Sequence, residues 1–282
     1  MKRIPIYIVC LAALLCGCTD TGKNKPTIFV SIAPLKSIIH DIVGDDFDIN
    51  IIVPAGASPE SFEPTPRQFI ALNNAEMVFS VGLIDFEQNL LSKISNKSKL
   101  VSLNAGIEPI AGSCSHNHEH GHHHHGVDPH IWSSPSTLKT MSHNAFKAIM
   151  TAYPDSIKYA EAYTLLSQRL DALDETVAQY CAAAKHKYFI VYHPALTYLA
   201  RDYGLEQIAI EHDGKEPSVK RLAQIIDRAR KDGIRKIFYQ SQFPKHVVEA
   251  LAADIGAQTV EIDPLREDAI ENIEYITRLI TE

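Results

Sequence analysis

The feature that most constrains the fold is a repeated alternation of short apolar runs, typical of β-strands, with helical stretches. In the first half of the chain, strands are predicted at residues 27–31, 47–53, 76–81 and 99–103. In the second half, strands are predicted at residues 187–192, 205–210, 235–239 and 258–262. Strands that alternate with helices in this way form parallel sheets with helices on both faces. We therefore expect an α/β protein with two similar lobes.

Between the two halves, residues 136–184 show helical periodicity and no strand pattern. One helix is predicted at 136–150 and a longer one at 154–184. At a rise of 1.5 Å per residue, about thirty residues span about 45 Å, which is the length of a two-domain molecule. We predict that the single long, rigid helix at 154–184 joins an N-terminal lobe at 27–153 to a C-terminal lobe at 185–282.

The N-terminus is typical of a secretory signal. Two cations precede a short apolar run, residues 4–15, which ends in Leu-Cys-Gly before Cys18. The run is too short to span a bilayer, and its ending resembles a bacterial lipobox. We predict a signal peptide at 1–17, lipidation of Cys18 and a tether at 18–26. The mature protein would be extracytoplasmic and anchored by lipid to a bacterial membrane, on its periplasmic face or at the cell surface.

The composition is that of a protein folded in water, and it bears on the partners. Apolar residues make up 45% and charged residues 22% of the chain, which are ordinary values for a globular domain. The formal net charge of −7 argues against nucleic acid as a partner. If Cys18 is acylated, Cys114 and Cys181 are left to pair in an oxidising compartment, although no sequence pattern brings them together.

A His-rich loop is predicted at residues 113–126. Half of the 14 histidines lie in it: His116, His118, His120, His122, His123, His124 and His125. The tract has no apolar face to bury, so it should be an exposed loop. Imidazole binds Zn²⁺, Cu²⁺ and Ni²⁺, and many alternative ligand pairs favour labile, auxiliary metal capture. The alternatives are a loop that is only solvated or an engineered tag, and an interrupted internal tract argues against a tag.

Four potential metal ligands follow predicted strands or lie beside proline. Glu60 lies in a Pro-bounded loop after the strand at 47–53, and His130 lies in the sequence Asp-Pro-His-Ile-Trp. His193 and Asp263 directly follow their strands. Ligands of open α/β sheets collect at the carboxyl ends of strands. Singly, each residue is weak evidence, because a histidine after a strand is often structural and Asp-Pro often opens a turn.

Together, in this order and along nearly the whole mature chain, these segments resemble the metal-binding proteins of bacterial zinc and manganese ABC importers, the ZnuA/TroA-like family. The resemblance implies two Rossmann-like lobes with one metal in the cleft between them, held by Glu60, His130, His193 and Asp263. It also implies a solute-binding protein, not an enzyme, that delivers its metal to a membrane permease and its ATPase. We expect a monomer. The His-rich loop lies where zinc-type members carry one.

Position 60 is where the chain departs from the family, since most members have Ser-Pro-His and this chain has Ser-Pro-Glu. A carboxylate is a competent zinc ligand, but two histidines with two carboxylates make a harder site that also suits Mn²⁺. We expect Zn²⁺, with manganese (or iron) as the alternative. Glu63 and His212 are reserve ligands for which a structural role is preferred, and Trp132 and Tyr192 are expected to wall the cleft.

Two other classes of function compete with this interpretation. A zinc hydrolase is poorly supported, because the chain has no His-Glu-x-x-His helix, no Gly-x-Ser-x-Gly turn and no Gly-rich phosphate loop after a strand. A metal-binding surface adhesin stays open on the sequence alone. It predicts binding to host matrix that survives the loss of His130 and His193.

Deleting residues 116–125 should slow or weaken metal loading at limiting zinc and leave one tight site, because the loop gathers ions that a separate site holds. Loading rates and competitive zinc titrations of the deleted and intact chains measure the two effects separately. Loss of the tight site on deletion would contradict this division of labour.

Overall fold

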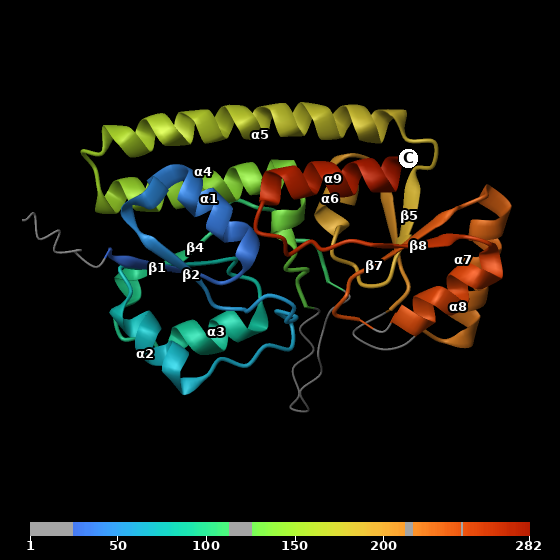
Figure 1. Cartoon of the computed structure of the whole chain (residues 1–282), viewed down its shortest axis with the longest axis horizontal. Coiled ribbons are helices and arrows are strands. Elements are labelled where there is room, and N and C mark those ends of the chain that lie inside the picture. The colour runs from blue at the N-terminus through green and yellow to red at the C-terminus, as the bar shows by residue number, and fades with distance from the viewer. Residues whose placement is uncertain (1–24, 113–125, 212–216, 244) are drawn as a thin grey trace, which may run out of the picture.

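Two lobes lie beneath one long helix in the computed structural model (Figure 1). The structure describes residues 25–112, 126–211, 217–243 and 245–282. The N-terminal lobe holds a four-stranded parallel sheet in the order β2-β1-β3-β4. Its strands are β1 (Thr27–Val30), β2 (Asp48–Ile51), β3 (Met77–Ser80) and β4 (Leu100–Ser102). The central strand β1 is apolar at its buried positions, Ile28 and Val30.

The C-terminal lobe repeats this topology. Its sheet is also four-stranded and parallel, in the order β6-β5-β7-β8. The strands are β5 (Tyr188–Val191), β6 (Glu206–Ala209), β7 (Lys236–Tyr239) and β8 (Gln258–Glu261). Each described strand falls within a predicted one, and the predicted fold class, two parallel α/β lobes, is confirmed.

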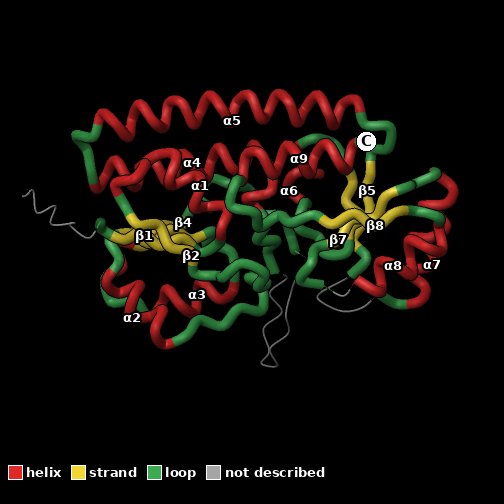
Figure 2. The backbone as a smooth tube through the Cα atoms, viewed as in Figure 1, coloured by secondary structure: helices red, strands yellow, loops and turns green. Residues whose placement is uncertain are grey.

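Helices cover the faces of both sheets (Figure 2). The N-terminal lobe contains α1 (Ala33–Val43), α2 (Pro66–Asn74), α3 (Asp85–Ser92) and α4 (Pro135–Ala152). The C-terminal lobe contains α6 (Thr197–Asp202), α7 (Val219–Asp232), α8 (Lys245–Ile255) and α9 (Ala269–Thr281). Short 3₁₀ turns are η1 (Gly44–Asp46), η2 (Lys97–Lys99) and η3 (Ile131–Ser133). Proline stands in the first turn of α1, α2 and α4, where its missing N–H is not needed.

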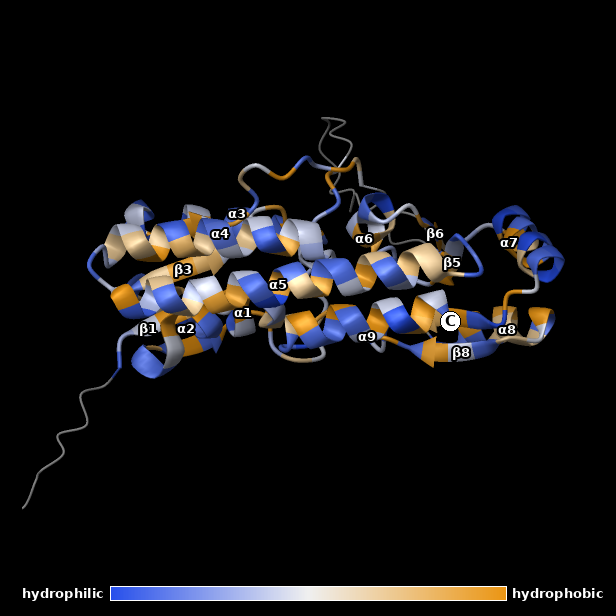
Figure 3. Ribbon diagram, turned by 90° about the horizontal axis from the view of Figure 1, so that it is seen from above, coloured by the Kyte–Doolittle hydropathy of each residue, from blue (hydrophilic) through white to orange (hydrophobic). Residues whose placement is uncertain are grey.

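The predicted long helix is present as α5 (Ile157–Ala183), with 27 residues. Ser156 caps its N-terminus, and its hydroxyl accepts the backbone N–H of Tyr159. At 1.5 Å per residue it is about 40 Å long and passes over both lobes (Figure 1). Seen from above, it lies between α4 and α9 (Figure 3), and it contacts both of them as well as α1.

One apolar core joins the lobes. It contains Val30 of β1, Leu170 of α5, Val191 of β5 and Ile276 of α9 in a single cluster of buried side chains. A second, smaller cluster, which includes Ile190, fills the other side of the C-terminal sheet. Since α9 of the C-terminal lobe packs along α5 and also touches α1 of the N-terminal lobe, the two lobes pack directly against each other.

Several predictions concern residues outside the ranges that the structure describes. The signal peptide at 1–17, Cys18 and most of the tether, and the His-rich tract at 113–125 lie outside the described residues. So does Cys114, whereas Cys181 is a free, buried thiol. Burial raises the pKa of that thiol to about 11, which makes it unreactive at neutral pH. Among the described residues, no helix is long and apolar enough to cross a membrane.

Candidate metal centre

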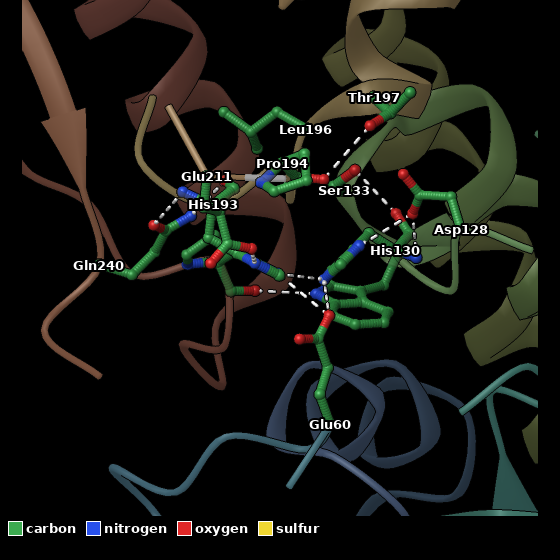
Figure 4. Close-up of polar contacts among 12 residues, drawn as sticks. Glu60, Asp128, His130, Ser133, His193, Pro194, Leu196, Thr197, Glu211 and Gln240 are labelled. Atoms are coloured by element: carbon green, nitrogen blue, oxygen red, sulfur yellow. Dashed lines mark hydrogen bonds and ion pairs between the residues drawn. The ribbon is translucent and has the colours of Figure 1, made fainter. Parts of the chain in front are cut away.

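Three potential metal ligands converge between the lobes: Glu60, His130 and His193 (Figure 4). His193 Nε2 lies 3.1 Å from Glu60 Oε1 and 3.2 Å from His130 Nε2. His130 Nε2 lies 3.7 Å from Glu60 Oε1. Both imidazoles are buried, and the Glu60 side chain is 14% exposed. In the described part of the chain, the structure thus brings together three of the four predicted ligands.

Each of these ligands lies beyond the carboxyl end of a strand or in a loop beside it. Glu60 lies in the loop between β2 and α2, and His130 directly precedes η3. His193 follows β5. The N-terminal lobe therefore supplies two ligands and the C-terminal lobe the third, at the edge where open parallel sheets bind ligands.

Asp128 orients the imidazole of His130. Its Oδ1 accepts the backbone N–H of His130 at 2.9 Å, which closes an Asx turn across Pro129. The same oxygen lies 2.8 Å from Nδ1 of the ring, and since a carboxylate only accepts, the proton belongs on Nδ1. Burial disfavours the charged carboxylate, but pairing with His130 outweighs burial and holds the pKa of Asp128 below its ordinary value. Nε2 is left as the ligand atom.

Glu211 orients His193 in the same way. Its Oε1 lies 2.6 Å from Nδ1 of the ring, and Gln240 Nε2 donates to the backbone carbonyl of His193 at 3.0 Å. Burial disfavours the imidazolium, but the hydrogen bonds to Glu211 and Glu60 outweigh burial and raise the pKa of His193 to about 9. Without metal, this ring therefore carries a proton where an ion would bind, and the ion has to displace it.

Asp263, predicted as the fourth ligand, lies outside this group of three. Its Oδ1 accepts the backbone N–H of Leu265 at 2.9 Å, and its backbone carbonyl accepts from Asn272 Nδ2 at 2.9 Å. The segment Asp263-Pro264-Leu265 forms the same Asx turn as the one at Asp128, with leucine where that turn has histidine. Its role as a ligand stays a prediction.

The ligands line a cavity of about 30 Å³, which has room for one ion and about one water. Most of the other wall residues are apolar: Pro59, Ile84, Pro129, Trp132, Ala195, Phe243, Pro264 and Leu265. Trp132 walls the cavity as predicted. Tyr192 instead belongs to the core of the C-terminal lobe, and the aromatic wall on that side is Phe243.

Glu211 is the main site residue that sequence reasoning missed. It lies 18 positions from His193 along the chain, and only strand pairing explains their contact. Val191 of β5 is opposite Ala209 of β6, and the two strands are parallel. The residues two positions later in each segment, His193 and Glu211, are therefore also neighbours. The Asp-x-His spacing at Asp128 was a readable signal for an Asx turn.

Of the two reserve ligands, Glu63 and His212, the structure describes only Glu63. Glu63 is exposed and does not belong to the three-ligand group. His212 lies outside the described residues.

The spacing of the three ligand atoms matches a tetrahedral ion. Zinc held by nitrogen and oxygen at about 2.0–2.1 Å has ligand atoms about 3.3–3.4 Å apart. The observed separations of 3.1, 3.2 and 3.7 Å bracket that value. These side chains are therefore arranged to receive one ion with only small adjustments.

Comparison with known proteins points the same way. The model of the family described as "zinc-uptake complex component A periplasmic" matches residues 28–281. The chain is 30% identical over 277 residues to the high-affinity zinc uptake system protein ZnuA of Bacillus subtilis, covering 92% of this chain and 86% of that protein. It is 27% identical over 299 residues to the zinc-binding lipoprotein AdcA of Streptococcus pneumoniae, covering 98% of this chain but 59% of that longer protein. A zinc-bound crystal structure of a ZnuA deletion mutant has a TM-score of 0.81 and 33% identity, covering 91% of this chain and 96% of that one.

Replacing Glu211 by glutamine should weaken zinc binding by about 10–100-fold, because the outer carboxylate fixes the orientation and basicity of the His193 ring. A competitive titration against a chromophoric chelator measures the affinity. Glu206→Gln is the matched control, since Glu206 is an exposed carboxylate of β6 that pairs with Arg228. Equal affinity in the Glu211 and Glu206 variants would show that Glu211 has no role in the site.

Proposed function

The chain belongs to the family of the periplasmic zinc-uptake complex component A, and we propose that it captures a divalent metal, zinc, and delivers it to the permease of an ABC importer. The observation that carries this proposal is the separation of the ligand atoms of Glu60, His130 and His193, which fits the ligand spacing of a tetrahedral zinc ion. We infer binding and release without catalysis. The cavity of about 30 Å³ has room for one ion and about one water.

The donor set favours zinc over manganese. Two imidazole nitrogens and one carboxylate oxygen suit Zn²⁺ at four-coordinate sites, whereas Mn²⁺ prefers more oxygen ligands in an octahedron. The small cavity leaves little room for the extra ligands of an octahedral ion. Manganese, the alternative, would need further oxygen ligands. Asp263, the fourth ligand expected from the sequence, could supply one.

Charge supports a cation as the cargo. Glu60, Asp128 and Glu211 bring three carboxylates to two imidazoles. A divalent ion with two neutral histidines would leave one net negative charge, which favours retention of the ion. The proton on His193 competes with the metal, so acid conditions favour release.

The fourth coordination position has two candidate occupants, Asp263 and a water. Asp263 would reach the ion only after its carboxylate leaves the backbone N–H of Leu265. A water needs no such movement, and the cavity has the room for one. We propose that water fills the position first and that Asp263 is the exchanging ligand.

The base of the His-rich tract supports a route from the tract to the site. The N–H of Gly112 donates to Gly126 O at 2.6 Å, and the N–H of Asp128 donates to Ile110 O at 2.9 Å. These bonds bring the two ends of the segment 113–125 together directly beside the turn that holds His130. We propose that ions captured by the tract pass from there to the neighbouring site at His130.

Two further proposals concern the location and the partners of the chain. We propose that the chain is lipid-anchored through Cys18, which rests on the lipobox sequence and on a relative named as a lipoprotein. We further propose that it acts as a monomer with a permease and its ATPase. The formal net charge of −7 agrees with a small cation, and not nucleic acid, as the ligand.

Competitive titration with Zn²⁺ and Mn²⁺ tests the proposed function. The chain should hold one tight zinc, and His130→Ala or His193→Ala should each weaken it by more than about 100-fold, beyond the loss expected for an outer partner. His143→Ala is the matched control, because His143 lies on α4 and faces Tyr163. A tight site that survives both ligand substitutions would place the metal elsewhere and overturn the proposal.

Glu60 should set the choice of metal. Glu60→His should raise the ratio of zinc to manganese affinity by about tenfold or more, because imidazole is a softer donor than carboxylate. The same two titrations measure the ratio. Glu63→His, an exposed change in the same loop, serves as the control and should leave the ratio unchanged. A ratio that falls in the Glu60 variant would contradict the argument from donor hardness.

A further inference from the structure

Each imidazole of the metal centre has an aromatic ring against it. The rings of Trp132 and His130 have centroids 5.1 Å apart and are tilted by 53°. The rings of Phe243 and His193 have centroids 4.6 Å apart and lie within 18° of parallel. Phe243 therefore covers one face of a ligand ring in a stacked arrangement.

The two aromatic walls differ in how they are held. Trp132 is 3% exposed, and its Nε1 donates to the backbone carbonyl of Pro264 at 3.0 Å, so it is fixed in the interface of the lobes. Phe243 is half-buried and packs on Tyr192 at 5.5 Å. Trp132 is an inner wall, and Phe243 lies between the ligand ring and solvent.

One turn sets the position of Phe243 relative to His193. The backbone N–H of Phe243 donates to Gln240 O at 3.1 Å. The side chain of Gln240 in turn holds the backbone of His193, whose carbonyl accepts its Nε2 at 3.0 Å. Gln240 is itself 2% exposed. The ring and the ligand are thus positioned by the same buried residue.

The mouth of the cavity is defined by its partly exposed wall residues. Apart from the ligand Glu60, these are Ser58, Gln242, Phe243 and Leu265. Phe243 is the aromatic member of this set, and its ring stacks on a ligand. Exchange of a bound ion requires water or an incoming ligand to approach through this mouth, and the apolar shell of a metal site controls that access.

We propose that Phe243 is a retention residue, which slows the departure of the bound metal by covering His193 at the mouth of the cavity. This proposal rests on the proposed function, since it takes the ion to lie between Glu60, His130 and His193. Phe243 contributes no ligand atom. Its removal should change how fast the ion leaves and not how many ions bind.

The test is the rate of zinc release. The full chain is loaded with one equivalent of Zn²⁺ and mixed with excess chelator in a stopped-flow instrument. Phe243→Ala should release zinc about tenfold faster, the low end for loss of an outer partner, while stoichiometry stays at one. Phe243→Tyr keeps the stacked ring and should release at close to the original rate.

A matched control separates this effect from a general loss of packing. Phe146 is a half-buried ring of α4 that stacks on Tyr163 at 4.0 Å and 5°, away from the cavity lining. Phe146→Ala should leave the release rate unchanged. If Phe243→Ala folds poorly, Phe243→Leu keeps apolar volume without the ring and should still release faster than Phe243→Tyr.

The outcomes separate the two proposals. If the unsubstituted chain holds no tight zinc, the proposed function fails and the retention role fails with it. If the chain holds zinc and the alanine and leucine variants release it at the original rate, only the retention role is overturned. Equal acceleration in the tyrosine and alanine variants would likewise overturn it, because the stacked ring would then not be the cause.

Discussion

Burial of α5 against both lobes is the constraint on which the metal site depends. Leu170 of this helix shares one core with β1 and β5, and α9 packs alongside. The core holds His130 of one lobe and His193 of the other with their Nε2 atoms 3.2 Å apart. A hinge between the lobes would let these atoms separate, and a tetrahedral site tolerates little error in position. A rigid helical bridge therefore suits a protein that must present a ready-made site to a scarce ion.

The site concentrates charge where charge is expensive to bury. Three carboxylates and two imidazoles occupy or adjoin one small cavity, and desolvation opposes ionisation there. Hydrogen bonds offset this cost: Asp128 stays ionised because it pairs with His130, and His193 keeps its proton because the carboxylates of Glu211 and Glu60 accept hydrogen bonds from its ring and raise its pKa. Buried ion pairs of this kind are weak evidence of stability. They are better understood as an arrangement that a divalent cation completes, and metal binding should in turn stabilise the folded chain.

Two Asp-Pro segments show which features of the site follow from local sequence and which depend on the tertiary structure. Both Asp128 and Asp263 close an Asx turn on the residue two places later. In the first turn that residue is His130, so the aspartate also orients a ligand. In the second turn that residue is Leu265, and the carboxylate of Asp263 accepts the backbone N–H of Leu265 without orienting a ligand. The sequence motif predicts the turn in both cases, but what the turn presents to the cavity depends on the residue that follows.

The sequence alone determined the two α/β lobes and the long helix, because hydrophobic periodicity is a local property. Positions after a strand or beside proline marked Glu60, His130 and His193 as candidate ligands, and the resemblance of their segments to a family of metal-binding proteins implied that they meet in one site. The tertiary structure decided the rest. Glu211 reaches His193 through the register of β5 with β6, and Phe243 reaches it through the turn at Gln240. Asp263 was expected beside the other ligands and lies outside their group. These outcomes depend on how strands pair and how the lobes pack, which is set by contacts between residues far apart in the chain and leaves no periodic signal along it.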